Sequence, residues 1–301
     1  MNIEEISDLI EQGKAILVLG PDIMFDDKKM LLKEFSNYLK TKGVAHKFND
    51  DEELFSSGTR FKPHVFQHLP KFFEKLQVQD IHKKIAEIPF HLIISLSPDT
   101  LLKKTFEDKD FDHDFSFYYK EKKAANMVKP TKEKPLLYNL LGIRSEYNSM
   151  VYCFNHLFDY LVSVLGKNEL PANLRSELQE AQIIFFLGFK YDKWYFKLIM
   201  RILNQDDEVL RHASFKEVEN CEGIINFYTD EFKFVFIKEL TGYEVIDQIH
   251  NFFKQKNALR KPKTTIAPEP HSVTNIITVT GHNNIVAQDI IGNVNVTEQK
   301  K

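Results

Sequence analysis

Three polar side chains follow or interrupt apolar runs that have the right length for buried strands. Ser97 and Asp99 come directly after the run at 90–96, and Asn139 lies within the run at 136–141. At the carboxyl end of a strand, where ligands bind in open α/β sheets, a serine hydroxyl can hold a water molecule for attack on a substrate. The same residues could instead have a structural role, because Ser97 and Asp99 can cap a helix and Asn139 can form hydrogen bonds with the backbone. Ser97, Asp99 and Asn139 are the candidate catalytic residues.

Turns that contain glycine close three of these runs and hold the candidate cofactor-binding residues: Gly20, Pro21, Asp22, Gly142, Gly188 and Phe189. Glycine permits close approach of the backbone, either to a phosphate or ribose or to a neighbouring strand. Pro21 lacks the backbone N–H that a phosphate would use, and Asp22 has the alternative role of a helix cap. Nucleotide contact and strand-to-helix turning both remain open for this set.

The spacing of the histidines and cysteines gives little support for a metal site or for thiol chemistry. Eight of the histidines are scattered: His46, His64, His68, His82, His91, His113, His156 and His212. His64 and His68 have the i, i+4 spacing that suits a metal on a helix, but no third ligand stands nearby. The two cysteines, Cys153 and Cys221, have no paired spacing. We therefore expect no metal site and a reducing, cytoplasmic setting.

Strands that alternate with helices must position these residues. The run at 15–19 is wholly apolar, which is typical of a strand buried on both faces in a parallel sheet, and a helical stripe follows from 31 to 39. Further strands are predicted at 90–96, 115–119, 136–141, 183–187, 224–228 and 233–238. The pattern predicts an α/β, Rossmann-like parallel sheet flanked by helices over residues 1–259.

The composition changes after residue 259. Residues 260–273 contain several prolines and are predicted to form an extended linker. The segment 274–301 is rich in Ile, Val, Asn and Gly and carries little charge, so it is predicted to form a short β tail. About twenty residues cannot bury a core of their own. We expect residues 274–298 to build a homo-oligomer, as a filament or a closed ring, or to recruit a partner; packing as an edge hairpin on the domain is the alternative.

The order of these signatures resembles the SIR2-like family, in the branch found in bacterial conflict and antiviral defence systems. The matching segments are 13–22 (GKAILVLGPD), 93–99 (IISLSPD), 134–142 (KPLLYNLLG), 158–161 (FDYL), 185–189 (FFLGF) and 192–194 (DKW). The resemblance covers about residues 1–255 and implies a Rossmann-like SIR2-type domain. It implies NAD as substrate or ligand, with Gly20 and Asp22 near the phosphates and Gly188 near the adenosine side.

Two positions of this sequence depart from the catalytic residues of the family. An active SIR2-type NAD hydrolase uses an asparagine to position water and a histidine near the nicotinamide ribose, and Ser97 and Leu141 occupy those positions here. Leucine cannot transfer a proton, although Asn139 or His91 could replace the missing groups. Two functions follow as expectations. One is a defence effector that hydrolyses NAD when assembled, and the other is a catalytically degenerate nucleotide-binding or scaffold module.

The overall charge and hydropathy exclude some partners. The net charge is −3, so no basic surplus favours nucleic acid or an anionic membrane. No apolar stretch reaches the roughly 18 residues that a membrane-spanning helix needs. The first residues are acidic and do not resemble a signal peptide.

Overall fold

The computed structural model describes residues 2–21, 31–56, 61–122, 127–204, 210–214 and 222–263. The chain divides into two compact units, Met1–Lys263 and Thr264–Lys301, and all described residues belong to the first. Asp22, the greater part of the predicted linker and the predicted β tail lie outside the described residues.

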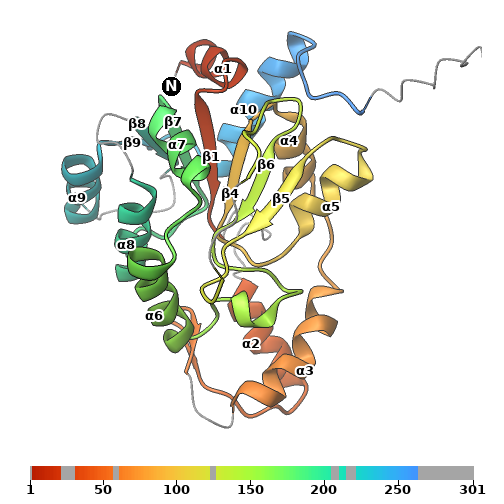
Figure 1. The fold of residues 1–301 in the computed structure, drawn as a ribbon, viewed down its shortest axis with the longest axis vertical. Helices are drawn as coiled ribbons and strands as arrows, with labels where there is room; N and C mark the ends of the chain where they lie inside the picture. Colours follow the sequence, from red (N-terminus) through yellow and green to blue (C-terminus); the bar gives the residue numbers. More distant parts are fainter. Residues whose placement is uncertain are drawn as a thin grey trace, which may run out of the picture. The chain divides into compact units, whose positions relative to one another are not determined.

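A sheet of seven strands occupies the centre of the described unit (Figure 1). Its strands are β1 (Ala15–Leu19), β4 (Leu92–Ser95), β5 (Asp114–Phe117), β6 (Leu136–Asn139), β7 (Ile183–Leu187), β8 (Leu210–Ser214) and β9 (Phe234–Ile237). The spatial order is β5-β6-β4-β1-β7-β8-β9, and every neighbouring pair is parallel. The predicted Rossmann-like parallel sheet is confirmed.

The strand order reverses between β1 and β7. After β1 the chain moves to β4 on one side of the sheet, and after β7 it moves to β8 on the other. The two outgoing connections therefore separate at the carboxyl ends of these neighbouring strands. In open α/β sheets, such a switch point leaves a crevice in which ligands bind.

Helices cover both faces of the sheet, which explains why β1 is apolar at every position. Ile16 and Val18 belong to one hydrophobic core, and Leu17 and Leu19 belong to the other. The first core is completed by α6 (Phe154–Val162), α7 (Ala172–Glu180), α8 (Trp194–Leu203) and α9 (Glu222–Phe232). The second is completed by α1 (Ile3–Glu11), α4 (Asp80–Glu87), α5 (Leu101–Asp108) and α10 (Gly242–Gln255).

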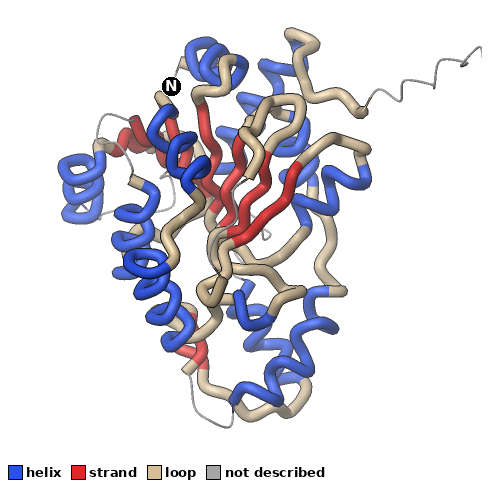
Figure 2. The backbone as a smooth tube through the Cα atoms, viewed as in Figure 1, coloured by secondary structure: helices blue, strands red, loops and turns tan. Residues whose placement is uncertain are grey.

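A third, smaller core lies beyond the carboxyl ends of the strands, at the lower end of the molecule in Figure 2. We call its main part, residues 31–76, the cap. Its elements are α2 (Leu31–Thr41), the antiparallel pair β2 (Phe48–Asn49) and β3 (Leu54–Phe55), and α3 (Phe61–Phe73). The cap joins the segment after β6, which includes a 3-10 turn (Tyr147–Ser149), because the Phe55 N–H donates to the Tyr152 carbonyl at 3.0 Å.

One predicted strand is wrong. Residues 224–228 lie inside α9, not in a strand. Ile224, Tyr228 and Phe232 recur every four residues and pack together on the first core, so their spacing is helical even though the run is apolar. The strand in this part of the sheet is β8, whose sequence, LRHAS, contains few apolar residues. The strand predicted at 233–238 is confirmed as β9.

A buried arginine marks the end of the described unit. The Arg260 guanidinium donates to the carbonyls of Ala86 (2.9 Å), Ile88 (3.1 Å) and Phe90 (2.8 Å), and also to that of Lys132. The first three carbonyls lie at the end of α4 and just before β4, and that of Lys132 lies in the loop before β6, so all four are at the amino edge of the sheet. Burial lowers the pKa of Arg260 to about 10, while the charge of Glu133 opposes this shift.

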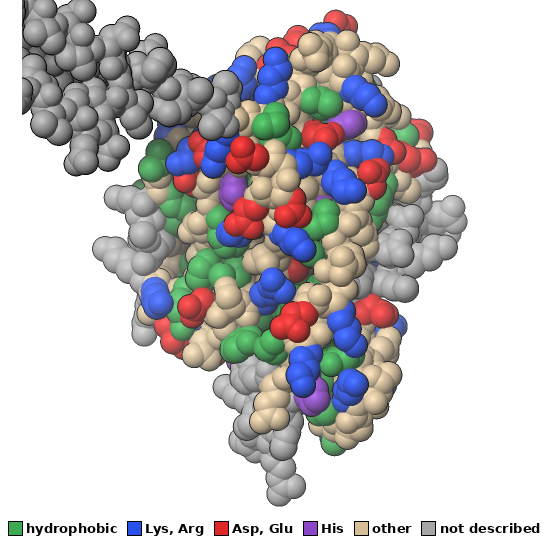
Figure 3. Space-filling model, turned by 90° about the vertical axis from the view of Figure 1, so that its right-hand side faces the viewer, with side chains coloured by type: hydrophobic (Ala, Val, Ile, Leu, Met, Phe, Trp, Pro, Cys, Tyr) green, Lys and Arg blue, Asp and Glu red, His purple; other side chains and the backbone are tan. Residues whose placement is uncertain are grey.

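The outer surface is mixed in charge on the face that Figure 3 presents, where lysines and arginines are interspersed with aspartates and glutamates. Among the described residues, the search for helices long and apolar enough to cross a membrane finds none.

Candidate functional site

The structure brings together the three candidate catalytic residues. Asn139 ends β6 and pairs in register with Ser95, the last residue of β4. Its amide nitrogen donates to the carbonyls of Ser97 (3.1 Å) and Asp99 (2.8 Å). All three predicted side chains are buried. Asn139 therefore fastens the loop after β4 to the neighbouring strand.

The side chains of Ser97 and Asp99 also form a hydrogen bond with one another. The Ser97 hydroxyl donates to Oδ2 of Asp99, while Oδ1 of Asp99 accepts from the backbone N–H of Leu101 at 2.8 Å. Leu101 begins α5, whose N-cap is Thr100, so Asp99 accepts the first N–H of that helix from the residue before the cap. Asp99 therefore has a structural role at the start of α5, whereas the Ser97 hydroxyl bonds to Asp99 and not to the helix backbone. The carboxylate, the hydroxyl and the Asn139 amide nitrogen all serve to shape a loop at the carboxyl edge.

A histidine that the sequence analysis left among the scattered ones lies beside this loop. His82 is fully buried in α4, and its Nδ1 accepts from the backbone N–H of Gln79 at 3.1 Å. Burial lowers the pKa of His82, and the nearby charge of Asp99 opposes that shift. Its Nε2 has no hydrogen-bond partner among the described residues. A neutral imidazole is the form that this environment favours.

The candidate glycines shape the carboxyl edge by close packing. The Gly20 N–H donates to the Leu187 carbonyl at 2.8 Å, and a Cβ on Gly20 would lie 2.0 Å from the carbonyl oxygen of Gly188. Gly188 and Gly142 have positive φ angles of 75° and 85°. A Cβ on Gly142 would lie 2.2 Å from the Ser149 carbonyl oxygen. Gly20 therefore packs directly against the turn after β7, where a larger side chain would not fit.

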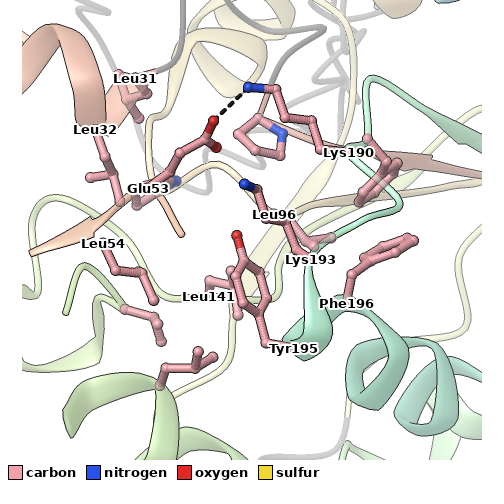
Figure 4. A pocket seen from close by; sticks show the side chains of 15 residues that line it. Leu31, Leu32, Glu53, Leu54, Leu96, Leu141, Lys190, Lys193, Tyr195 and Phe196 are labelled. Carbon is pink, nitrogen blue, oxygen red and sulfur yellow. Dashed lines mark hydrogen bonds and ion pairs between the residues drawn. The ribbon is translucent and has the colours of Figure 1, made fainter. Parts of the chain in front are cut away.

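A pocket opens at this same edge (Figure 4). Its walls include residues that follow four different strands: Pro21 after β1, Leu96 and Pro98 after β4, Leu141 after β6, and Phe189 after β7. It encloses roughly 780 Å³ of empty space, a volume that includes the part open to solvent. Of the candidate residues, Pro21 and Phe189 line the pocket; Ser97, Asp99 and Asn139 are not among its walls.

The cap, Val151, α6, the β7–α8 loop and the first turn of α8 supply the remaining walls. Leu31, Leu32 and Leu54 contribute apolar surface from the cap. The polar and charged lining comes from residues that the sequence analysis did not select: Glu53, Lys190, Lys193 and Tyr195. Oε1 of Glu53 accepts from the Lys190 ammonium at 2.5 Å, as the dashed line in Figure 4 marks.

Local signals for these polar residues exist but are weak. Glu53 ends the acidic run at 50–53, which by itself indicates only a solvated turn. Lys190 and Lys193 follow the Gly188-Phe189 turn by one and four residues. Basic residues placed just after a strand's carboxyl end are suited to anions, and that position could have raised them as candidates.

His91 cannot supply the proton-transfer group for this pocket. It lies just before β4, at the amino edge, opposite to the end where the pocket opens. Its Nε2 pairs with Glu177 at 3.2 Å. Burial raises the pKa of Glu177, but hydrogen bonding and charge from His91 and Lys129 outweigh it, so the net pKa is lowered. Among the described residues, no group of three or more His, Cys, Asp or Glu side chains could hold a metal ion.

Comparisons with known proteins give a distant likeness in fold. No family model matches the chain, and no curated protein matches it. Sixty-nine solved chains match, among them one described as "Structural Basis for the Mechanism and Regulation of Sir2 Enzymes". That match has a TM-score of 0.41 and 13% identity, and it covers 85% of this chain and 98% of the other. At this level the likeness assigns no family, and the Rossmann-like class rests on the parallel strand order described above.

Proposed function

We propose that this chain binds a nucleotide, with NAD as the first ligand to test, in the pocket at the carboxyl edge of the sheet. The observation that carries the proposal is the position of the pocket. It opens where the outgoing connections of β1 and β7 separate, and its walls include Pro21 and Phe189 from the turns that follow those two strands. This is the position at which doubly wound α/β proteins bind their ligands.

The chemistry of the lining supports a nucleotide in particular. Phe189 and Phe196 offer aromatic surface to a base or a nicotinamide ring. Lys190 and Lys193 bring positive charge to one wall, where phosphates would be stabilised. A mostly apolar cavity with a few charged groups on one side is typical of a site for a ligand with a flat ring and an anionic group.

A thermal shift experiment with a blocked pocket tests this proposal. Leu141→Trp places an indole in the cavity, whereas Leu198→Trp makes the same change on the outer face of α8. NAD should raise the melting temperature of the wild type and of Leu198→Trp, because a ligand that binds only the folded state stabilises it. It should leave Leu141→Trp unchanged. Equal stabilisation of all three proteins, or of none, would overturn the proposal.

A second candidate function is hydrolysis of the bond between nicotinamide and ribose. The observation in its favour is that Ser97, Asp99 and Asn139 meet at the carboxyl edge, next in sequence to the pocket residues Leu96 and Pro98. Their side chains are engaged with one another, which favours binding over catalysis in the state described. Release of nicotinamide from NAD by the full chain, lost in Ser97→Ala and Asn139→Ala, would support hydrolysis. Binding without release would exclude it.

Assembly through residues 274–298, or recruitment of a partner defence protein by them, is a further part of the proposal. It rests on their β-branched, asparagine-rich and nearly uncharged sequence. Deleting residues 270–301 should lower the mass measured by light scattering from that of an assembly to that of a single chain. An unchanged mass per particle, apart from the deleted segment, would contradict assembly by the tail.

A further inference from the structure

Glu53 combines two features that are unfavourable in a folded protein. Its backbone has a φ of 58°, in the left-handed region that side chains other than glycine rarely occupy. It is also 94% buried, and its Oε2 has no hydrogen-bond partner among the described residues. A buried carboxylate oxygen without a donor loses its hydration and gains nothing in return. Strain and an unpaired polar atom on one pocket residue indicate a functional position.

Two lysines fix the loop that carries Glu53. Lys190 holds Oε1 of Glu53 at 2.5 Å, and the Lys193 ammonium donates to the carbonyl of Asp51. Both lysines come from the loop between β7 and α8, so the β2–β3 turn of the cap is bound directly to the sheet. Glu53 is thereby held against the pocket with one oxygen engaged and the other unpaired (Figure 4).

The charges on this wall restrict the ligand. One carboxylate and two ammonium groups give a net positive charge, which attracts an anion. The carboxylate repels a bare anion but accepts a hydrogen bond from a hydroxyl, and hydrogen bonds to charged groups are the stronger ones. The ligand that satisfies both conditions carries a phosphate and a neighbouring hydroxyl donor.

We propose that Glu53 is the ribose-recognising residue of this pocket, accepting a hydrogen bond from a sugar hydroxyl while Lys190 and Lys193 face the phosphate. This inference rests on the proposed function, because it assigns parts of a nucleotide to particular side chains. It adds a specificity: the pocket selects ribose phosphates over 2-deoxyribose phosphates.

Ribose 5-phosphate and 2-deoxyribose 5-phosphate are suitable probes, because they differ in one hydroxyl. Their dissociation constants for the full chain can be measured by NMR titration. The wild type should bind ribose 5-phosphate about tenfold more tightly, the difference expected for one hydrogen bond to a charged acceptor. In Glu53→Gln, which retains the shape of the side chain, the preference should fall to about twofold or less. Asp50→Asn removes the same charge from an exposed site on the same loop and should keep the preference.

Lys190→Gln provides a second variant. It should weaken the binding of both sugar phosphates, because the phosphate is common to both, and it should also reduce the preference for ribose 5-phosphate, because Oε1 of Glu53 loses the ammonium that holds it. Equal binding of the two sugars by the wild type, or a full preference in Glu53→Gln, would overturn the inference. If NAD binds but the preference does not depend on Glu53, the inference alone fails. If the preference depends on Glu53 but NAD does not bind, the assignment of NAD alone fails.

Discussion

The two edges of the sheet use buried charge in different ways. At the amino edge, Arg260 donates to backbone carbonyls from the end of α4, the segment before β4 and the loop before β6. At the carboxyl edge, Glu53 keeps one buried oxygen without a partner, and its backbone is strained. The first arrangement stabilises the fold, whereas the second is maintained at the expense of stability. The contrast supports the proposed site at the carboxyl edge by an argument independent of topology.

The largest expected loss of stability follows from a substitution at the amino edge. Arg260→Met should lower the free energy of unfolding by about 3 kcal/mol, because several buried carbonyls lose their donor at once. Urea denaturation measures this change, and Lys261→Met, at an exposed neighbouring position, is the matched control. The preference for ribose 5-phosphate should persist in the folded variant. Loss of that preference would show that the two edges are not separate in function.

A smaller loss is expected from Asn139→Ala at the carboxyl edge. Removing the amide leaves the carbonyls of Ser97 and Asp99 without that donor, which should reduce the free energy of unfolding by about 2 kcal/mol. The measurement is again urea denaturation. Unchanged stability together with complete loss of NAD binding would show that Asn139 contacts the ligand. It would contradict the interpretation that Asn139 holds the loop after β4.

Acid sensitivity should arise partly at the amino edge through Glu177. Its pKa is lowered in the folded state, so its contribution to stability is present above its ordinary pKa and is lost as the pH falls through the lower, folded value. Glu177→Gln should therefore be about 1 kcal/mol less stable than wild type at pH 7, with the deficit shrinking below about pH 4.5. Glu107→Gln removes a more exposed carboxylate and should show little change at either pH. A deficit that persists at pH 3 would contradict this origin.

The smallest expected change in the free energy of unfolding is an increase, in contrast to the decreases above. Glu53→Gly should raise the free energy of unfolding by about 0.5 kcal/mol, because glycine adopts a positive φ without strain and the unpaired carboxylate disappears. The same change should abolish the preference for ribose 5-phosphate. Glu52→Gly also removes an unpaired buried carboxylate oxygen but has no positive φ to relieve, so it isolates the effect of strain and should instead reduce stability. A loss of stability in Glu53→Gly as large as that in Glu52→Gly would remove the argument from strain.

The sheet could be predicted from sequence because parallel strands are buried on both faces. The run at 15–19 can be recognised as a strand without knowledge of its neighbours, and its carboxyl end places Pro21 at the pocket. The strand β8 could not be found in this way, since LRHAS has no apolar run. The run at 224–228 misled because apolar content and helical spacing coincide there.

The charged side of the pocket could not be predicted because it depends on contacts between distant segments. Glu53 and Lys190 are 137 residues apart in sequence and meet only because the cap packs over the carboxyl edge. Ser97 and Asn139 were found by their position after or within strands, but their hydrogen bonds to the same loop require the register of β4 and β6. Local patterns place residues at an edge, and tertiary packing decides which of them face a cavity.

The pocket also lies where the core of the cap meets the core on one face of the sheet, and the cap residues Leu32 and Leu54 already pack on the sheet core there. Leu31 belongs to the core of the cap, whereas Leu96 and Phe196 belong to the core on one face of the sheet. A ligand in the pocket would contact both cores and would link the cap to the sheet. Its binding should make the cap and the sheet unfold in a single, more cooperative transition, and slow amide hydrogen exchange in α2 more than in α10.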